Sequence, residues 1–199
     1  MNILLSVMPK KDVPTFTPDS RQAWRQWLKK HHRSEQSVWL TMYKKETGKP
    51  SMEWSDAVDE ALCFGWIDST RKTVGEGAFI QYFTRRKPSS NWSKINKEKV
   101  KRLIAEGKMT DAGMACIEMA KQNGSWSRLD QVEEGVLPKD LEKAFKAHRG
   151  SKPYFMGLSK SVRKMMLGWI AMAKRPETRE KRIQEIAVAA GEGRRLKQF

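Results

Sequence analysis

The run GWIDSTRKTVGEGAFIQYFT, residues 65–84, predicts the central feature of the fold, a β-hairpin. Its two ends, residues 65–70 and 79–84, are rich in the β-branched and aromatic side chains that favour strands. Between them lies a Gly-Glu-Gly turn at residues 75–77, where glycine accepts the positive backbone angles of tight hairpin turns. We therefore expect two antiparallel strands joined at this turn.

The residues before the hairpin predict one more strand and two helices. Residues 38–43, VWLTMY, have strand composition and precede a Gly-Lys-Pro turn. Thr17 as a cap and Pro18 as the first helical residue predict a helix that ends near Lys30. A second helix is expected to open at Ser51. Together with the hairpin, these elements indicate the α+β class, with helices packed on a small antiparallel sheet.

The helix expected from Ser51 has two contrasting faces. The apolar face carries Trp54, Ala57, Val58, Ala61 and Leu62. The opposite face carries the acidic residues Asp56, Asp59 and Glu60. We expect the apolar face to pack on the sheet and the acidic face to be solvated.

Beyond Trp92, helical periods and cap signals replace the strand patterns. A first helix is expected to end at Gly107, and a second is expected to begin at the cap Thr110 and to end at Asn123-Gly124. After a loop over residues 125–137, a third helix is expected between Pro138 and Ala147. A fourth helix should open at Ser159, and the last should run from Pro176 to Gly191. We expect residues 1–88 to form an α+β region. Residues 89–199 are expected to form a helical region packed on it as one compact unit.

Length and composition exclude several classes of protein. The 199 residues, with 39% hydrophobic side chains and eight Trp, suffice for a folded core. Cys63 and Cys116 cannot form a disulfide framework or a zinc knuckle. Residues 1–11 lack the flanks of a signal peptide and are interpreted as a leading segment, and no stretch approaches the roughly 20 apolar residues of a membrane span. We therefore expect a cytoplasmic protein without a cofactor.

The charge is strongly positive and unevenly distributed. The chain has 39 Lys and Arg against 23 Asp and Glu, a net charge of +16. Residues 1–88 hold 15 basic and 10 acidic side chains, whereas residues 89–199 hold 24 and 13. A charge of this size attracts polyanions, anionic lipid or an acidic protein.

The densest polar cluster follows the last predicted strand, over residues 84–96, TRRKPSSNWSKIN. Two arginines and a lysine precede a Ser/Asn turn that leads into a helix N-terminus, where free N–H groups favour an anion. Trp92 adds a flat face on which a nucleobase could stack. The members of this predicted anion-binding loop are Arg85, Arg86, Lys87, Ser90, Trp92, Ser93, Lys94 and Asn96. The alternative is a strand end and a helix cap with solvated charges.

Asp68 and Trp66, on the first strand of the hairpin, are a second candidate. Asp68 lies amid apolar neighbours, where a carboxylate needs a partner, and Arg85 or Arg86 could supply it. A structural ion pair is favoured over a catalytic acid, because no second carboxylate or histidine lies near in sequence. Asp68 and Trp66 stay the candidate site acid and site aromatic.

Other reactive side chains have structural interpretations. Cys63, between two apolar residues, is predicted to be a buried core thiol. His31 and His32 follow the end of a predicted helix, where their rings can satisfy carbonyl groups, so we place no metal there.

Several runs of the sequence resemble the YdeI/OmpD-associated family. They are ALCFGWID at 61–68, TRRKP at 84–88, WSKIN at 92–96, LIAEG at 103–107, MTDAG at 109–113 and AKRPETR at 173–179, so the resemblance covers nearly the whole chain. The family is described as bacteriocin-protecting or porin-associated and has no established catalytic residues. The resemblance therefore implies a porin association and a role in stress resistance, but no site residue.

The resemblance also implies a superfamily that includes frataxin-like iron chaperones and DNA-binding proteins, with helices on one small antiparallel sheet. An iron chaperone needs an acidic surface, but both halves of this chain are net positive. The only close acidic cluster is that of Asp56, Asp59 and Glu60. The iron role is therefore disfavoured against nucleic-acid binding.

Three functions are consistent with the sequence. The leading hypothesis is a non-enzymatic cytoplasmic protein that binds an anionic partner, nucleic acid being favoured, through residues 85–96 and the adjacent helix. The second is an interaction with an acidic protein in envelope or bacteriocin stress. The third is an enzyme acting on a small anionic substrate, with Asp68 as acid or base and Arg85 and Arg86 as a clamp.

Overall fold

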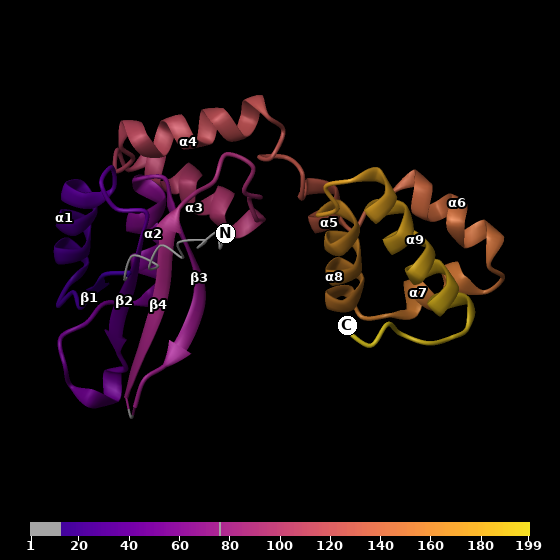
Figure 1. Ribbon diagram of the computed structural model, residues 1–199, viewed down its shortest axis with the longest axis horizontal. Helices are drawn as coiled ribbons and strands as arrows, with labels where there is room; N and C mark the ends of the chain where they lie inside the picture. The colour runs from indigo at the N-terminus through magenta and orange to yellow at the C-terminus, as the bar shows by residue number, and fades with distance from the viewer. Residues whose placement is uncertain (1–12, 76) are drawn as a thin grey trace, which may run out of the picture. The chain divides into compact units, whose positions relative to one another are not determined.

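The computed structural model describes residues 13–75 and 77–199 and confirms the α+β class (Figure 1). The leading segment, residues 1–11, and Glu76 of the predicted hairpin turn lie outside the described residues. The elements in chain order are β1 (Thr15–Phe16), α1 (Arg21–His31), β2 (Ser37–Tyr43), a 3-10 turn (Lys45–Thr47), α2 (Trp54–Cys63), β3 (Trp66–Thr73), β4 (Ala78–Arg85), α3 (Lys94–Ala105), α4 (Asp111–Gln122), α5 (Asp130–Glu134), α6 (Lys139–Ala147), α7 (Ser151–Gly157), α8 (Lys160–Ala171) and α9 (Pro176–Gly191).

The chain forms two compact units, and each is described by itself. The first unit comprises the chain up to Pro88 together with Glu98–Met119, and the second comprises Ser89–Lys97 and Ala120–Phe199. The boundary at Pro88 agrees with the predicted one. Residues 98–119, which we expected in the helical region, belong instead to the first unit. That the two halves pack as one compact body stays a prediction.

The sheet of the first unit has the strand order β1-β2-β4-β3. β4 pairs with β3 and with β2, antiparallel in both cases, which confirms the predicted hairpin. β1 pairs parallel with β2, placing Thr15 opposite Trp39, so the sheet is mixed rather than purely antiparallel. A strand of two residues is too short to show an alternating pattern, and for this reason the sequence did not predict it.

One face of the sheet carries the core of the first unit. Val38, Leu40 and Met42 of β2 are buried beside Phe79 and Phe83 of β4. The helices α1 and α2 cover this face, and the Trp24 ring of α1 lies 5.3 Å from the Phe83 ring. Trp24 Nε1 also donates a hydrogen bond of 3.0 Å to the carbonyl of Ala57 in α2. Figure 1 shows the strands side by side, with α1 beside the sheet.

The first two helices begin later than the cap signals predicted. Ser20, not Thr17, caps α1, because its hydroxyl accepts the N–H of Ala23 at 3.2 Å. The hydroxyl of Ser51 accepts the N–H of Tyr43 and so holds the loop on β2, and α2 begins only at Trp54. Trp54 is therefore 44% exposed rather than part of the core.

Two of the three acidic residues of α2 are buried, so the predicted solvated face was wrong for Asp59 and Glu60, while Asp56 is partly exposed. Asp59 and Glu60 are each 2% exposed. Glu60 pairs with Arg21 and Arg25 of α1, both at 2.6 Å, and Asp59 pairs with two cations of α3. We call these six residues the ionic cluster: Asp59, Glu60, Arg21, Arg25, Lys99 and Arg102. Cations from both neighbouring helices cover this face, and a pattern within α2 alone could not show this.

Two glycines let α4 pack closely against the junction of α2 and β3. A Cβ on Gly113 of α4 would lie 2.3 Å from the carbonyl oxygen of Cys63, too close for any side chain. Gly65 has φ +73°, and a Cβ added to it would lie 3.1 Å from the carbonyl oxygen of Ala112. Thr110, the predicted cap of α4, donates its hydroxyl to the same Cys63 carbonyl at 2.6 Å. These contacts explain why residues 111–119 of α4 belong to the first unit.

In the second unit, helix signals were more accurate. α6 ends at Ala147 and α9 spans Pro176–Gly191 as predicted, and the Ser159 hydroxyl caps α8 by accepting the N–H of Val162. The short helices α5 and α7 lie in stretches where we expected none. The core of this unit includes Leu141, Phe145, Phe155, Leu167, Ile170, Ile183 and Ile186. No helix among the described residues is long and apolar enough to cross a membrane.

Candidate functional site

The predicted anion-binding loop is divided between the two units. Arg85 ends β4 in the first unit, while residues 89–97 belong to the second. The Arg85 guanidinium donates to backbone carbonyls of the turn after α1, those of Glu35, at 2.8 Å, and Arg33. Arg85 therefore holds the 33–36 turn against β4. Lys87 is exposed.

Arg86 is buried to 9% exposure at the end of β4, and its backbone N–H donates to the carbonyl of Gly65 at 2.9 Å. Burial lowers the pKa of Arg86 to about 10, and the nearby Cys116 and Asp68 offset this only in part. The guanidinium therefore carries its charge in surroundings that do not fully compensate it.

The second part of the loop has a structural role. Trp92 is buried and packs on Trp126 at 4.9 Å between ring centroids, so the stacking face that we expected is not exposed. Ser93 caps α3, as the alternative of a helix cap implies, because its hydroxyl accepts the N–H of Asn96 at 3.3 Å. Lys97 pairs with Asp130 and lies over the Trp126 ring. Ser90 is half-buried and Lys94 is exposed.

Arg86 lines a cleft of about 360 Å³ that lies wholly in the first unit. We call it the arginine cleft. Its residues are His32, Arg33, Phe64, Gly65, Trp66, Arg85, Arg86, Pro88, Ala112, Ala115, Cys116 and Met119. Three arginines thus meet an apolar wall that α4 and the Phe64–Trp66 segment supply. The close approach of α4 at Gly113 brings that wall opposite the end of β4.

Trp66 and Asp68 lie on β3, the first strand of the hairpin, as expected, but the hydrogen-bond donors to Asp68 differ from the expected arginine. Trp66 is fully buried, and its indole N–H donates to the carbonyl of His32 at 3.4 Å. The Asp68 carboxylate accepts hydrogen bonds from Trp54 Nε1 and Gln81 Nε2, both at 3.1 Å, rather than from an arginine. Burial raises the pKa of Asp68, against the lowering effects of the Trp54 hydrogen bond and of the Arg86 charge. The partners of Asp68 are therefore neutral side chains of the same sheet and of α2.

The thiols and histidines agree with their structural interpretations. Cys63 is fully buried, which confirms the predicted core thiol, and burial raises its pKa. Burial also raises the pKa of Cys116, with Arg86 opposing. His32 is the C-cap residue of α1, and its Nδ1 lies 2.9 Å from the carbonyl of Leu28. Over residues 13–75 and 77–199, no three His, Cys, Asp or Glu side chains are grouped as a metal site.

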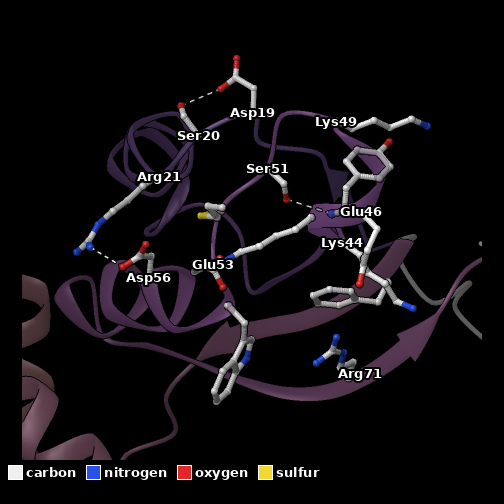
Figure 2. A pocket seen from close by; sticks show the side chains of 15 residues that line it. Asp19, Ser20, Arg21, Lys44, Glu46, Lys49, Ser51, Glu53, Asp56 and Arg71 are labelled. Atoms are coloured by element: carbon white, nitrogen blue, oxygen red, sulfur yellow. Dashed lines mark hydrogen bonds and ion pairs between the residues drawn. The ribbon is translucent and has the colours of Figure 1, made fainter. Parts of the chain in front are cut away.

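A larger cleft of about 740 Å³ lies between the start of α1 and the loop after β2 (Figure 2). Its walls mix both charges, and much of that charge is paired within the cleft. Arg21 pairs with Asp56 and Lys45 with Glu53, each at 2.7 Å. Figure 2 shows Arg21 and Asp56 turned toward each other, with Arg71 across the cleft. This polar cleft does not select one sign of charge, whereas the arginine cleft does.

Sequence reasoning found Arg85, Arg86 and Trp66 but missed the other members of the arginine cleft. His32 and Arg33 come from the turn after α1, and Cys116 and Met119 come from α4. Only the Gly65 and Gly113 pair could have indicated that these segments meet, because two glycines far apart in sequence permit a close backbone approach.

Comparison with known families divides the chain between residues 116 and 134, the region in which the first unit ends and the second continues. Residues 16–116 match a family described as Domain of unknown function (DUF8412), and residues 134–193 match one described as Bacteriocin-protection, YdeI or OmpD-Associated. No curated protein and no solved structure matches the chain.

The second match confirms the resemblance to the YdeI/OmpD-associated family but limits it to the second half of the chain. Of the runs that carried the resemblance, only residues 173–179 lie inside that match. The runs between residues 61 and 113 lie inside the other match, which spans half of the chain. The chain therefore belongs to the family of unknown function DUF8412 through residues 16–116, and its residues 134–193 are similar to the YdeI/OmpD-associated family.

Proposed function

We propose that this protein is a non-enzymatic binding protein for an anionic partner, and that one anionic group of that partner occupies the arginine cleft. The observation that carries the proposal is Arg86, a guanidinium that is 9% exposed, lines the cleft and has a lowered pKa. Burial removes the water that stabilises the guanidinium charge, and an anion beside Arg86 would stabilise that charge in place of the water.

The volume and the lining of the cleft suit a bound ligand group. A volume of about 360 Å³ is within the range of ligand sites, which combine apolar walls with a few convergent polar groups. Phe64, Ala112 and Met119 supply apolar wall, while Arg33 and Arg86 supply charge. Guanidinium groups bind carboxylate and phosphate oxygens through paired, charge-assisted hydrogen bonds.

Nucleic acid is the partner to test first. The net charge of +16 favours a polyanion, and phosphate contacts dominate such binding. The basic helix of the original hypothesis contributes less than expected, because Lys97, Lys99 and Arg102 of α3 are ion-paired. The arginine cleft therefore replaces the loop and helix as the proposed contact.

The test is a salt titration with labelled single-stranded DNA and RNA, followed by fluorescence anisotropy from about 50 mM to about 200 mM salt. Two double variants each remove two positive charges. Arg33→Ala with Arg86→Met alters the cleft, and Arg175→Ala with Lys181→Ala alters exposed cations of the second unit. We expect the cleft variant to lose at least about tenfold more affinity and to show a shallower salt slope.

The outcomes separate the versions of the proposal. Equal losses in the two double variants would mean that diffuse charge, not the cleft, binds the nucleic acid. No binding near 50 mM salt would reject nucleic acid. Calorimetry with pyrophosphate and with a small aromatic carboxylate would then test the cleft directly, and no heat from either would reject the anionic-group proposal itself.

A further inference from the structure

The second unit carries an apolar groove along α8 that its own core does not fill. The groove has a volume of about 620 Å³ and is lined by α5, α8 and the last residues of the chain. On α8 its lining includes Met165, Gly168, Trp169 and Met172. The spacing of three and four residues places these side chains on one face of the helix.

The exposure of this face is unusual for methionine. Met165 is 46% exposed and Met172 is 55% exposed. Methionine is flexible and polarisable, and exposed methionines recur on surfaces that adapt to amphipathic helices. Gly168 lies between them, and its Cβ position meets nothing nearer than Val132 at 3.8 Å, so a partner side chain can approach the α8 backbone there.

A second cleft of about 310 Å³ continues along α8 and shares Val132, Glu133 and Lys164 with the groove. The Lys164–Glu133 ion pair, at 2.5 Å, therefore separates two parts of one surface. With the 12 residues of α8, the surface is about 18 Å long, which is enough for roughly three turns of a partner helix.

The two ends of this surface differ in charge. The lining near Met172 and Trp169 is apolar, with Arg182 of α9 over the Trp169 ring at 4.9 Å, whereas Lys160, Arg163 and Glu134 line the other end. Lys160 and Arg163 have no carboxylate partner among the residues that the structure describes, and Arg163 instead lies 3.6 Å from the sulfur of Met156. The surface thus offers apolar sites along most of its length, and the end that Lys160 and Arg163 line has a net positive charge, because Glu133 is paired with Lys164 and Glu134 offsets only one of the two remaining cations.

We propose that this surface, the α8 groove, binds an amphipathic helix of a partner protein whose apolar side chains fill the groove and whose acidic end meets Lys160 and Arg163. The charge at one end selects an acidic helix over a basic one, and the apolar sites at helical spacing match the helix-in-groove mode of recognition. This role goes beyond anion binding at the arginine cleft and involves no residue of that cleft.

The test uses the full chain and two synthetic peptides of about 18 residues. Both carry leucine at every third or fourth position, and they differ in having glutamates or lysines at one end. Fluorescence anisotropy should show that the acidic peptide binds at least about tenfold more tightly than the basic one. Met165→Glu should weaken that binding by at least about tenfold, because it places a carboxylate in the apolar groove. The matched control is Ile104→Glu on α3 of the first unit, where the wild-type side chain is 45% exposed, and it should bind as wild type does.

A charge reversal keeps the proposal falsifiable if a single variant fails to fold. Lys160→Glu with Arg163→Glu should reverse the preference, so that the basic peptide now binds more tightly. The proposal is overturned if neither peptide binds up to roughly 1 mM, if both bind equally, or if the reversed variant keeps the wild-type preference. It is also overturned if Met165→Glu abolishes a self-association of the chain while leaving peptide binding intact, which would make a second copy the occupant.

Discussion

The ionic cluster and the arginine cleft both bury charge in the first unit, but they compensate it differently. In the cluster, burial opposes the charge of Arg21, yet the hydrogen bond and charge of Glu60 outweigh burial and raise the pKa of Arg21. In the cleft, burial outweighs the opposing groups and lowers the pKa of Arg86. The cluster joins three helices, whereas Arg86 lines a cleft that a ligand could enter.

This difference separates a structural buried charge from a candidate binding charge. A buried ion pair contributes little net stability when intact, but removing one partner leaves an uncompensated charge that is costly. A charge that is poorly compensated in the folded protein behaves in the opposite way, because its removal costs little stability and its value lies in binding. The comparison therefore predicts opposite patterns for substitutions at the two sites.

The largest effect is expected from removing both α1 cations of the ionic cluster. Arg21→Ala with Arg25→Ala leaves Glu60 buried without its two partners, and we expect a loss of about 3–5 kcal/mol in the free energy of unfolding. Urea denaturation measures this loss. A second variant, Glu60→Gln added to the same pair, should recover part of it, because the buried group is then neutral. No recovery would mean that lost packing, not charge, causes the effect.

The second effect concerns the α4 wall of the arginine cleft. Gly113→Ala would place a Cβ 2.3 Å from the Cys63 carbonyl, so α4 must shift, at a cost of about 1–3 kcal/mol. The matched control is Gly168→Ala on α8, where the nearest atom is 3.8 Å away and higher helix propensity should leave stability unchanged or slightly improved. Anion binding should weaken only in Gly113→Ala. If Gly113→Ala left the free energy of unfolding unchanged, the close packing of α4 against Cys63 would be contradicted.

Local signals predicted much of this architecture, and long-range contacts account for most of what they missed. Pro176 and the Ser159 cap located α9 and α8 because a cap or a proline acts within one turn of its helix. The burial of Asp59 could not be predicted, because the cations that cover it belong to α3, about 40 residues away in sequence. Arg86 was identified as a site residue, but the α4 wall beside it follows from the packing of Gly113.

A smaller effect is expected at Arg86 itself. Arg86→Met removes a poorly compensated charge and keeps most of the side-chain volume, so stability should change by no more than about 1 kcal/mol. Anion binding should nevertheless be lost, by at least about tenfold. Urea denaturation and anisotropy on the same preparations measure both quantities. A loss of stability as large as that of the α1 double variant would show that Arg86 is a structural charge like those of the ionic cluster.

The smallest effect is expected at Asp68, which accepts two hydrogen bonds from neutral donors. Because burial raises its pKa in the folded protein, the folded state holds the proton more tightly than the unfolded state does. Asp68 therefore lowers stability at neutral pH, and this penalty disappears as the pH falls below its unfolded pKa. Asp68→Asn keeps an acceptor for Trp54 and Gln81 without the charge, so it should stabilise the protein by less than about 1 kcal/mol at pH 7. Urea denaturation at several pH values should show the gain shrinking toward acid pH, and a gain that grows instead would mean that Asp68 is stabilised as a carboxylate.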